Sequence, residues 1–191
     1  NIVFGGSNGS RTVTVTPALN QFGVATITVN VSDGVNTTPE TFLVTVNSVN
    51  DLPTITSIST QNISEDAPAG TGILAFTVGD VETPAVSLTV TRTSTNLVLM
   101  PVANVVLGGS GASRTVIATP APNQFGSTTI TLTVSDGTTT VNTNFVVNVA
   151  SVNDDPTITL ITDQIINENT STGALAFTIG DVETAVGSLS V

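Results

Sequence analysis

Several residue types are missing from this 191-residue sequence, and each absence excludes a function. The chain has no Cys, His, Lys, Trp or Tyr. Without Cys no disulfide can form, and without Lys no Lys–Asn isopeptide bond can cross-link the fold. Because His, Cys, Lys and Tyr supply most general bases and nucleophiles, the composition predicts that the chain is not an enzyme.

Positive charge is also scarce. The sequence has 14 acidic residues against 3 basic ones, a formal net charge of −11, and the three basic residues are Arg11, Arg92 and Arg114. Nucleic acids and anionic membrane surfaces are bound through cationic side chains, so neither is an expected partner. No run of 18 or more apolar residues is present, which predicts no membrane insertion. The acidic balance favours cations as ligands, or simple solubility.

An internal repeat organises the chain. The segment from Asn1 to Pro17 matches the segment from Asn104 to Pro120, which sets a period of 103 residues, and a later match (74–83 with 175–184) has an offset of 101. We therefore divide the chain into the C-terminal half of a repeat (1–50), a complete repeat (51–153) and the N-terminal half of the next repeat (154–191).

The division leaves two interpretations open. The chain is either an excerpt of a longer repeat protein, or residues 154–191 are completed by residues 1–50 of a neighbouring copy through strand exchange. Both interpretations predict head-to-tail association into a rod or filament.

Apolar residues alternate with polar ones along the repeat, the two-residue period of half-buried strands. Turn residues separate the runs, including a glycine-rich segment at 108–113 that we interpret as a hairpin turn. Seven strands are expected, near 55–64, 72–79, 86–93, 97–107, 113–119, 127–135 and 142–151. This number in about 100 residues is typical of all-β immunoglobulin-like sandwiches, here in tandem. Phe76, Phe125 and Phe145 are the expected core anchors, and Arg11 and Arg114 are expected to pair with surface carboxylates.

Acidic residues gather at recurring places of the repeat. They lie at the repeat boundary, shortly after it, after the second expected strand, and in the Ser-Asp-Gly turn before the last strand. Alternate loops of a sandwich share one end, so several of these carboxylates are expected to meet there and to repel one another unless a cation bridges them. Calcium prefers such oxygen ligands.

These motifs, in this order and spacing, resemble cadherin-type repeats, and more closely the cadherin-like repeats of giant bacterial surface proteins and adhesins. The segments that carry the resemblance are Glu65-Asp66-Ala67-Pro68, Gly79-Asp80-Val81-Glu82, Ser135-Asp136-Gly137 and Val152-Asn153-Asp154. The resemblance implies calcium ions between repeats. It assigns the early Glu to Glu65 and Glu168, the linker ligands to Asn50, Asp51, Asn153 and Asp154, the acidic pair to Asp80, Glu82, Asp181 and Glu183, and the late Asp to Asp33 and Asp136.

The sequence departs from the cadherin pattern at two places. The Asp-Arg-Glu motif before the fifth strand has no counterpart in residues 104–111, and the linker lacks one Asp. A solvated acidic end that only confers solubility is therefore the alternative to calcium binding.

The resulting functional hypothesis is a structural repeat of an extracellular filament or cell-surface stalk or adhesin, with calcium stiffening its junctions and a cell-surface or glycan partner. A carbohydrate-binding accessory module of a secreted protein is the alternative, although sugars usually stack on Trp or Tyr, which are absent.

Overall fold

The computed structural model describes all residues from Asn1 to Val191, and its regular structure is almost entirely β-strand. The central repeat contains eight strands and one short 3₁₀ helix, and the all-β prediction is confirmed. The elements are β5 (Thr54–Ile55), β6 (Gln61–Ser64), β7 (Leu74–Gly79), β8 (Thr89–Ser94), η1 (Val102–Asn104), β9 (Val105–Ser110), β10 (Ser113–Ala118), β11 (Gly126–Ser135) and β12 (Thr140–Ala150). None of the helical segments is long and apolar enough to cross a membrane.

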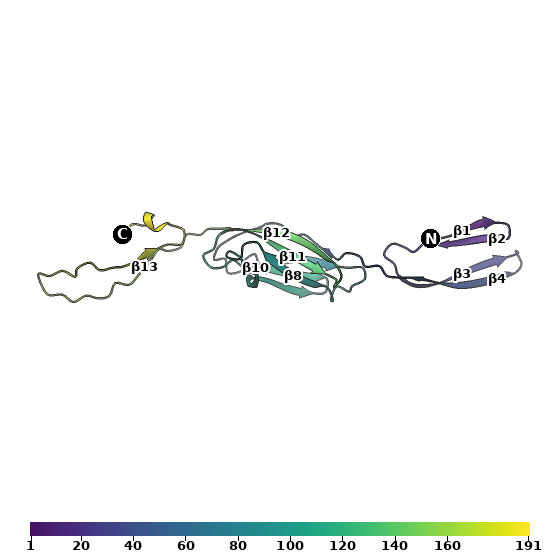
Figure 1. Ribbon diagram of the computed structural model, residues 1–191, viewed down its shortest axis with the longest axis horizontal. Helices are drawn as coiled ribbons and strands as arrows, with labels where there is room; N and C mark the ends of the chain where they lie inside the picture. The colour runs from purple at the N-terminus through teal and green to yellow at the C-terminus, as the bar shows by residue number, and fades with distance from the viewer.

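Two four-stranded sheets form a sandwich in the central repeat (Figure 1). Their strand orders are β5-β7-β10-β9 and β6-β12-β11-β8. Along β11, Ile130, Leu132 and Val134 are fully buried, whereas the residues between them are partly exposed. This alternation places every second side chain between the sheets, and burial of those side chains is the main driving force for the fold.

The expected first strand, 55–64, is two strands. β5 pairs antiparallel with β7 in one sheet, whereas β6 pairs parallel with β12 in the other. The apolar residues Ile55, Ile58 and Ile63 are three and five positions apart, and all three pack against the core. Because odd spacings break the two-residue period, a single strand cannot bury all three, and the chain crosses between the sheets instead.

The expected strand 97–107 is wrong in its first part. The chain turns after Asn96, whose side-chain oxygen accepts hydrogen bonds from the amides of Val98 (3.2 Å) and Leu99 (3.1 Å), and β9 begins only at Val105. Asn favours such local bonds over a strand ladder. The turn still contributes to packing, because Leu99 and Met100 are fully buried.

Two of the three phenylalanine predictions are confirmed. Phe76 and Phe145 are each 3% exposed, but Phe125 is 47% exposed. Phe125 precedes β11 in a segment where Asn123 and Gly126 have positive φ values of 55° and 123°. These turns keep Phe125 at the end of the sandwich, away from the inward face.

The arginine prediction is wrong. The Arg114 guanidinium donates hydrogen bonds to the carbonyl oxygens of Gly111 (2.8 Å), Ala85 (3.1 Å) and Leu88 (3.1 Å). Arg11 likewise donates to the Gly6 carbonyl oxygen (3.1 Å). Each side chain therefore braces backbone in or beside the glycine-rich hairpin of its own repeat. The hairpin at 108–113 joins β9 and β10 as expected.

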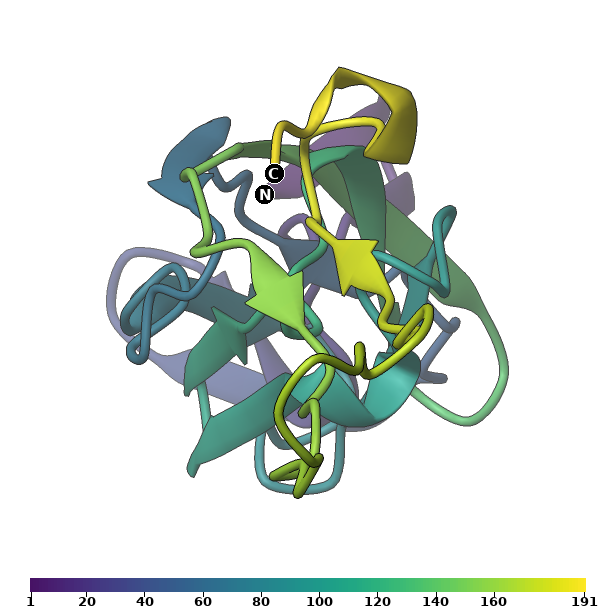
Figure 2. The same cartoon turned by 90° about the vertical axis from the view of Figure 1, so that its left-hand side faces the viewer.

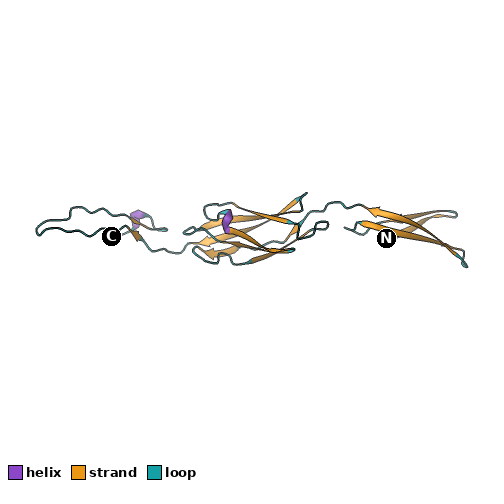
Figure 3. Ribbon diagram, turned by 90° about the horizontal axis from the view of Figure 1, so that it is seen from below, coloured by secondary structure: helices purple, strands orange, loops and turns teal.

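The flanking segments lie on either side of the central sandwich and give the molecule an elongated shape (Figures 1 and 3). The N-terminal segment forms two separate hairpins, β1 (Ile2–Ser7) with β2 (Ser10–Val15) and β3 (Gly23–Ser32) with β4 (Thr37–Val46). The C-terminal segment has one short pair, β13 (Thr157–Ile158) with β14 (Ile179–Gly180), followed by η2 (Val186–Ser188). Viewed along the long axis, the three parts lie behind one another (Figure 2).

Candidate functional site

The boundary between the first half-repeat and the central sandwich brings together acidic segments from three parts of the chain. We call Asn50, Asp51, Asp80, Glu82 and Asp136 the N-terminal junction. The Asp51 amide donates to Glu82 Oε2 (2.9 Å), and the Asn50 side-chain amide donates to Asp136 Oδ2 (3.0 Å). The linker, the loop after β7 and the turn between β11 and β12 thus meet at one end of the sandwich.

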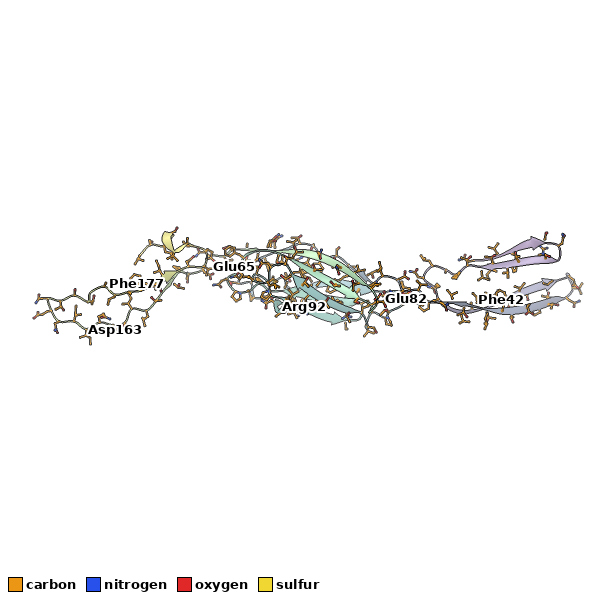
Figure 4. The ribbon with its side chains drawn as sticks, viewed as in Figure 1. Phe42, Glu65, Glu82, Arg92, Asp163 and Phe177 are labelled. Carbon is orange, nitrogen blue, oxygen red and sulfur yellow. The ribbon has the colours of Figure 1, made fainter.

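The opposite end of the sandwich repeats this arrangement. We call Glu65, Asp66, Asn153, Asp154, Asp181 and Glu183 the C-terminal junction. The Asp154 amide donates to Glu183 Oε2 (3.0 Å), the counterpart of the Asp51–Glu82 bond, and the Val152 amide donates to Glu65 Oε1 (2.7 Å). Figure 4 shows Glu65 and Glu82 at opposite ends of the central sandwich.

Hydrogen bonds within a turn fix the acidic pairs that follow β7 and β14. Asp80 Oδ1 accepts hydrogen bonds from the amides of Glu82 (3.0 Å) and Thr83 (2.7 Å). Asp181 Oδ1 accepts the equivalent bonds from Glu183 (3.0 Å) and Thr184 (2.6 Å). An Asp that closes a turn on its own following amides holds the next Glu in a fixed direction, which here is toward the linker.

Asp136 is held in a similar way in the turn between β11 and β12. Its Oδ1 accepts bonds from the amides of Thr138 and Thr139, both 2.6 Å, and its Oδ2 accepts a bond from the Thr139 hydroxyl (2.7 Å). Thr139 also lies within 3.4 Å of the Asn50 side-chain nitrogen. Thr139 was not among the predicted site residues, although its position three residues after an Asp in a turn is a signal for this bond.

Four carboxylates of the two junctions have one oxygen that is buried without a partner, and three of the four (Glu65, Asp80 and Glu183) use the other oxygen to accept a backbone bond. The unpartnered oxygens are Glu65 Oε2, Asp154 Oδ2 and Glu183 Oε1 at the C-terminal junction, and Asp80 Oδ2 at the N-terminal junction. Glu65 is only 1% exposed. A buried carboxylate oxygen without a hydrogen bond is unfavourable, so these atoms fit the donor set of a hard cation.

The carboxylates do not close around a single point. No three acidic side chains of the chain are gathered so that they could ligate one metal ion together. Binding an ion would therefore require the side chains to move inward, or further ligands to be added.

The electrostatic field differs between the junctions. Partial burial, followed by repulsion from Glu183 and from the neighbouring carboxylates of Asp66, Glu65 and Asp181, raises the pKa of Asp154. Hydrogen bonds, led by the Thr139 amide, hold the pKa of Asp136 well below its usual range. The Thr184 amide likewise lowers the pKa of Asp181. The raised pKa of Asp154 reflects the negative charge gathered around it at the C-terminal junction, which has no counter-ion. Asp66, which was not among the predicted ligands, adds to this field.

Two of the predicted ligands lie apart from both junctions. Asp33 is exposed in the turn between β3 and β4, where its Oδ1 accepts the amides of Val35 (2.8 Å) and Asn36 (2.7 Å), which lower its pKa. Glu168 is exposed in a turn of the C-terminal segment. The structure brings the other ten predicted residues to the two junctions, five to each.

An open cavity adjoins the N-terminal junction. Its lining combines the loop before β3, the linker and the acidic pair: Asn20, Gln21, Phe22, Asn47, Val49, Asp51 and Glu82. Phe22 is the counterpart of Phe125 and is 50% exposed. Phe22 therefore belongs to the junction region and not to a core.

Comparison with known proteins shows the fold class. The structure of protocadherin gamma B2 extracellular cadherin domains 3–6 matches with a TM-score of 0.54 and 15% identity, over 96% of this chain and 45% of that one. Human protocadherin-24 EC1-2 matches at 0.47 and 15% identity (78% and 80% covered), and surface layer protein SbsC, domains 4–9, at 0.41 and 19% (92% and 31% covered).

This chain thus spans less than half of the protocadherin gamma B2 structure. Searches against protein-family profiles and curated proteins give no match. The protein has a cadherin-like, immunoglobulin-type β-sandwich fold, and at such low identity the likeness extends to the fold alone.

Proposed function

We propose that this chain is a structural repeat of an extracellular filament or cell-surface stalk or adhesin, in which calcium ions at the junctions hold neighbouring repeats in line. The observation that carries the proposal is the junction itself, which occurs twice with the same linker-amide-to-glutamate bond, at 2.9 Å and 3.0 Å. A contact that recurs with the period of the repeat serves the array and not a single reaction.

The linkers are short enough for a calcium ion at the junction, which we call the calcium clamp, to limit bending between repeats. β4 ends at Val46 and β5 begins at Thr54, and β12 ends at Ala150 and β13 begins at Thr157. Within each linker, the bond from the Asp amide to the glutamate ties the linker to the following repeat, at the loop after β7 for Asp51 and after β14 for Asp154. Fixing a short linker at its middle limits bending between repeats, and stacked repeats with stiff joints form a rod.

Calcium would be held by the buried carboxylate oxygens that have no hydrogen-bond partner. At the C-terminal junction these are Glu65 Oε2, Asp154 Oδ2 and Glu183 Oε1, and at the N-terminal junction Asp80 Oδ2 is the equivalent. The ion would supply positive charge between carboxylates that otherwise repel. Calcium accepts six to eight oxygen ligands, and calcium sites of extracellular modules work at about 10⁻⁴ to 10⁻³ M, which suits an extracellular location.

The proposal is tested by thermal unfolding in calcium and in chelator. A ligand at about 100 times its Kd stabilises the folded state by about 2.7 kcal/mol, and 1 kcal/mol shifts the midpoint of a domain of about 100 residues by about 4–8 °C. We expect calcium to raise the midpoint and Asp80→Asn to reduce the rise. Asp163→Asn, an exposed acid away from both junctions (Figure 4), is the matched control and should leave the rise intact.

An unchanged midpoint on adding calcium would reject the clamp. An equal loss of the calcium effect in the Asp80 and Asp163 variants would show that calcium acts through general charge and not at the junctions.

A further inference from the structure

The central sandwich has four edge strands, which differ in how readily they could accept a further strand. The sheet orders place β5 and β9 at the edges of one sheet, and β6 and β8 at the edges of the other. β5 has two residues and β6 has four, whereas β8 and β9 have six each. Very short edges offer few unpaired backbone groups, so β8 and β9 are the two edges at which a further strand could pair. Both belong to the complete central repeat.

An inward-facing arginine closes the β8 edge. Arg92 pairs with the fully buried Leu132 of β11, and directly paired residues point to the same face of a sheet, so Arg92 starts on the inner face. Its Nε is buried without a hydrogen-bond partner. Figure 4 shows Arg92 on the central sandwich, between the ends that Glu65 and Glu82 mark. A strand added beside β8 would take this unpaired charge further from water, which is unfavourable, and inward charges are one way in which proteins keep sheet edges unpaired.

The β9 edge has no such barrier. β9 pairs with β10 alone, and the segment 104–113 has no charged residue although the chain carries a net charge of −11. Val106 is 54% exposed. Gly109 has a φ of 80°, which bends the chain near the end of β9, so the part that is open to pairing is Val105–Gly108. An uncharged, partly apolar edge of this kind can add a strand through its free backbone groups.

We propose that β9 pairs antiparallel with β9 of a second copy, so that two chains lie side by side and two β5-β7-β10-β9 sheets become one continuous sheet. The register is centred on Val106, which lies within the straight part of β9. Val106 then faces Val106 of the second copy, and the two exposed side chains form an apolar cross-strand pair. An antiparallel pair of identical strands has two-fold symmetry, the commonest symmetry of protein dimers.

The repeat indicates that the partner is a second copy. The β9 segment recurs with the period of 103 residues, since Asn1 to Pro17 match Asn104 to Pro120, so an array offers one such edge in every repeat. A partner that pairs with several of these edges at once needs the same spacing, and another copy has it. Each edge is only a few residues long, so one pairing is weak, and several linked pairings bind much more tightly than one.

The distribution of charge permits this lateral pairing. Neither β9 nor β10 contains a carboxylate, so the pairing places no two acidic side chains opposite each other. The acidic residues gather instead at the two junctions, at the ends of the sandwich. The choice of a second copy rests on the proposed role as a repeat, but the pairing itself uses none of the residues that we assign to calcium.

Cysteine cross-linking tests the pairing directly, since the chain has no native cysteine. Val106→Cys chains should form a covalent dimer on mild oxidation, because directly opposed residues of an antiparallel pair have Cα atoms about 4.5–5.5 Å apart, within the range of a disulfide. Thr91→Cys is the matched control, at an exposed position in the middle of β8, where little cross-linking is expected. Adding Arg92→Leu to Thr91→Cys should open that edge and increase the cross-linking.

Charged substitutions and sedimentation in chelator complete the test. The parent should form dimers that dissociate on dilution. Val106→Lys should be monomeric at concentrations where the parent is dimeric, with an unfolding midpoint close to that of the parent, because the position is exposed. Thr91→Lys, which places the same charge on the β8 edge, should form dimers as the parent does.

The outcomes separate the parts of the proposal. Cross-linking of Val106→Cys no greater than that of Thr91→Cys, or dimers of Val106→Lys as strong as those of the parent, would overturn the pairing of β9. Unchanged cross-linking at Thr91 after Arg92→Leu would overturn the role of Arg92 alone. A calcium-dependent midpoint without dimers rejects the lateral pairing alone, and dimers in chelator without a calcium-dependent midpoint reject the calcium clamp alone.

Discussion

The substitution Glu65→Gln should be neutral or stabilising without calcium and should lose this advantage when calcium is added. Glu65 is 1% exposed, its Oε1 accepts the Val152 amide at 2.7 Å, and its Oε2 is buried without a partner. Gln keeps the shape and the accepting oxygen, replaces the unpartnered oxygen with an N–H donor, and removes one negative charge from the surroundings of Asp154.

The expected magnitudes come from these contacts. In chelator, the bond from Val152 weakens because its acceptor loses charge, a loss of about 1 kcal/mol, while replacing a buried carboxylate that has no counter-ion with a neutral amide returns about 1–3 kcal/mol. The variant should therefore be as stable as the parent, or more stable by about 1–2 kcal/mol. In calcium the variant lacks a ligand, and a tenfold loss of affinity removes about 1.4 kcal/mol of the stabilisation that calcium gives the parent, which offsets the gain in chelator.

Thermal unfolding of both chains in chelator and in calcium measures this difference. Glu40→Gln, at an exposed position of β4, is the control and should behave like the parent in both conditions. If Glu65→Gln is destabilising by the same amount with and without calcium, Glu65 serves only the hydrogen bond to Val152 and the reasoning about its second oxygen is refuted.

Two further predictions concern pH and core packing. In chelator, the midpoint should rise as the pH is lowered toward the ordinary carboxyl pKa of 3.8, because the raised pKa of Asp154 lets the folded chain take up that proton first; Asp154→Asn should remove the rise. Below that value the midpoint should fall, because the lowered pKa values of Asp136 and Asp181 mean that protonation breaks bonds of the folded state, and Asp136→Asn should flatten the fall. In urea unfolding, Phe145→Ala should cost about 3–5 kcal/mol, whereas Phe125→Ala, at a 47% exposed position, should cost much less; equal costs would contradict the assignment of Phe125 to the end of the sandwich.

Repetition in the sequence made much of the fold predictable. Alternation identified the long strands β11 and β12, because β11 buries every second side chain from Thr128 to Val134 and β12 does so from Phe145 to Val149. The period then predicted which acidic segments share an end of the sandwich, and the bonds from Asp51 to Glu82 and from Asn50 to Asp136 place them together. The assignment of these residues as calcium ligands remains a prediction.

The features that the sequence did not predict depend on non-local geometry. The division of the first strand into β5 and β6 is decided by the partners that each piece finds in opposite sheets. Arg114 binds carbonyl oxygens because the loop at 85–88 lies beside its hairpin, which no local pattern encodes. Phe125 has the large apolar side chain of a core residue, but the turn before β11 places it at the end of the sandwich, where it is 47% exposed.

The hydrogen bonds of the junction hold the linker without a cation and leave carboxylate oxygens that the proposed cation would use. Glu183 gives Oε2 to the Asp154 amide and keeps Oε1 free, and Glu65 gives Oε1 to the Val152 amide and keeps Oε2 free. The backbone bonds therefore hold the linker in place before any ion arrives, so a cation would not have to order the linker on binding. Preorganisation of this kind lowers the entropic cost of binding. A cation would in turn relieve the repulsion that raises the pKa of Asp154, so ion binding and linker bonding should reinforce each other instead of competing for the same oxygens.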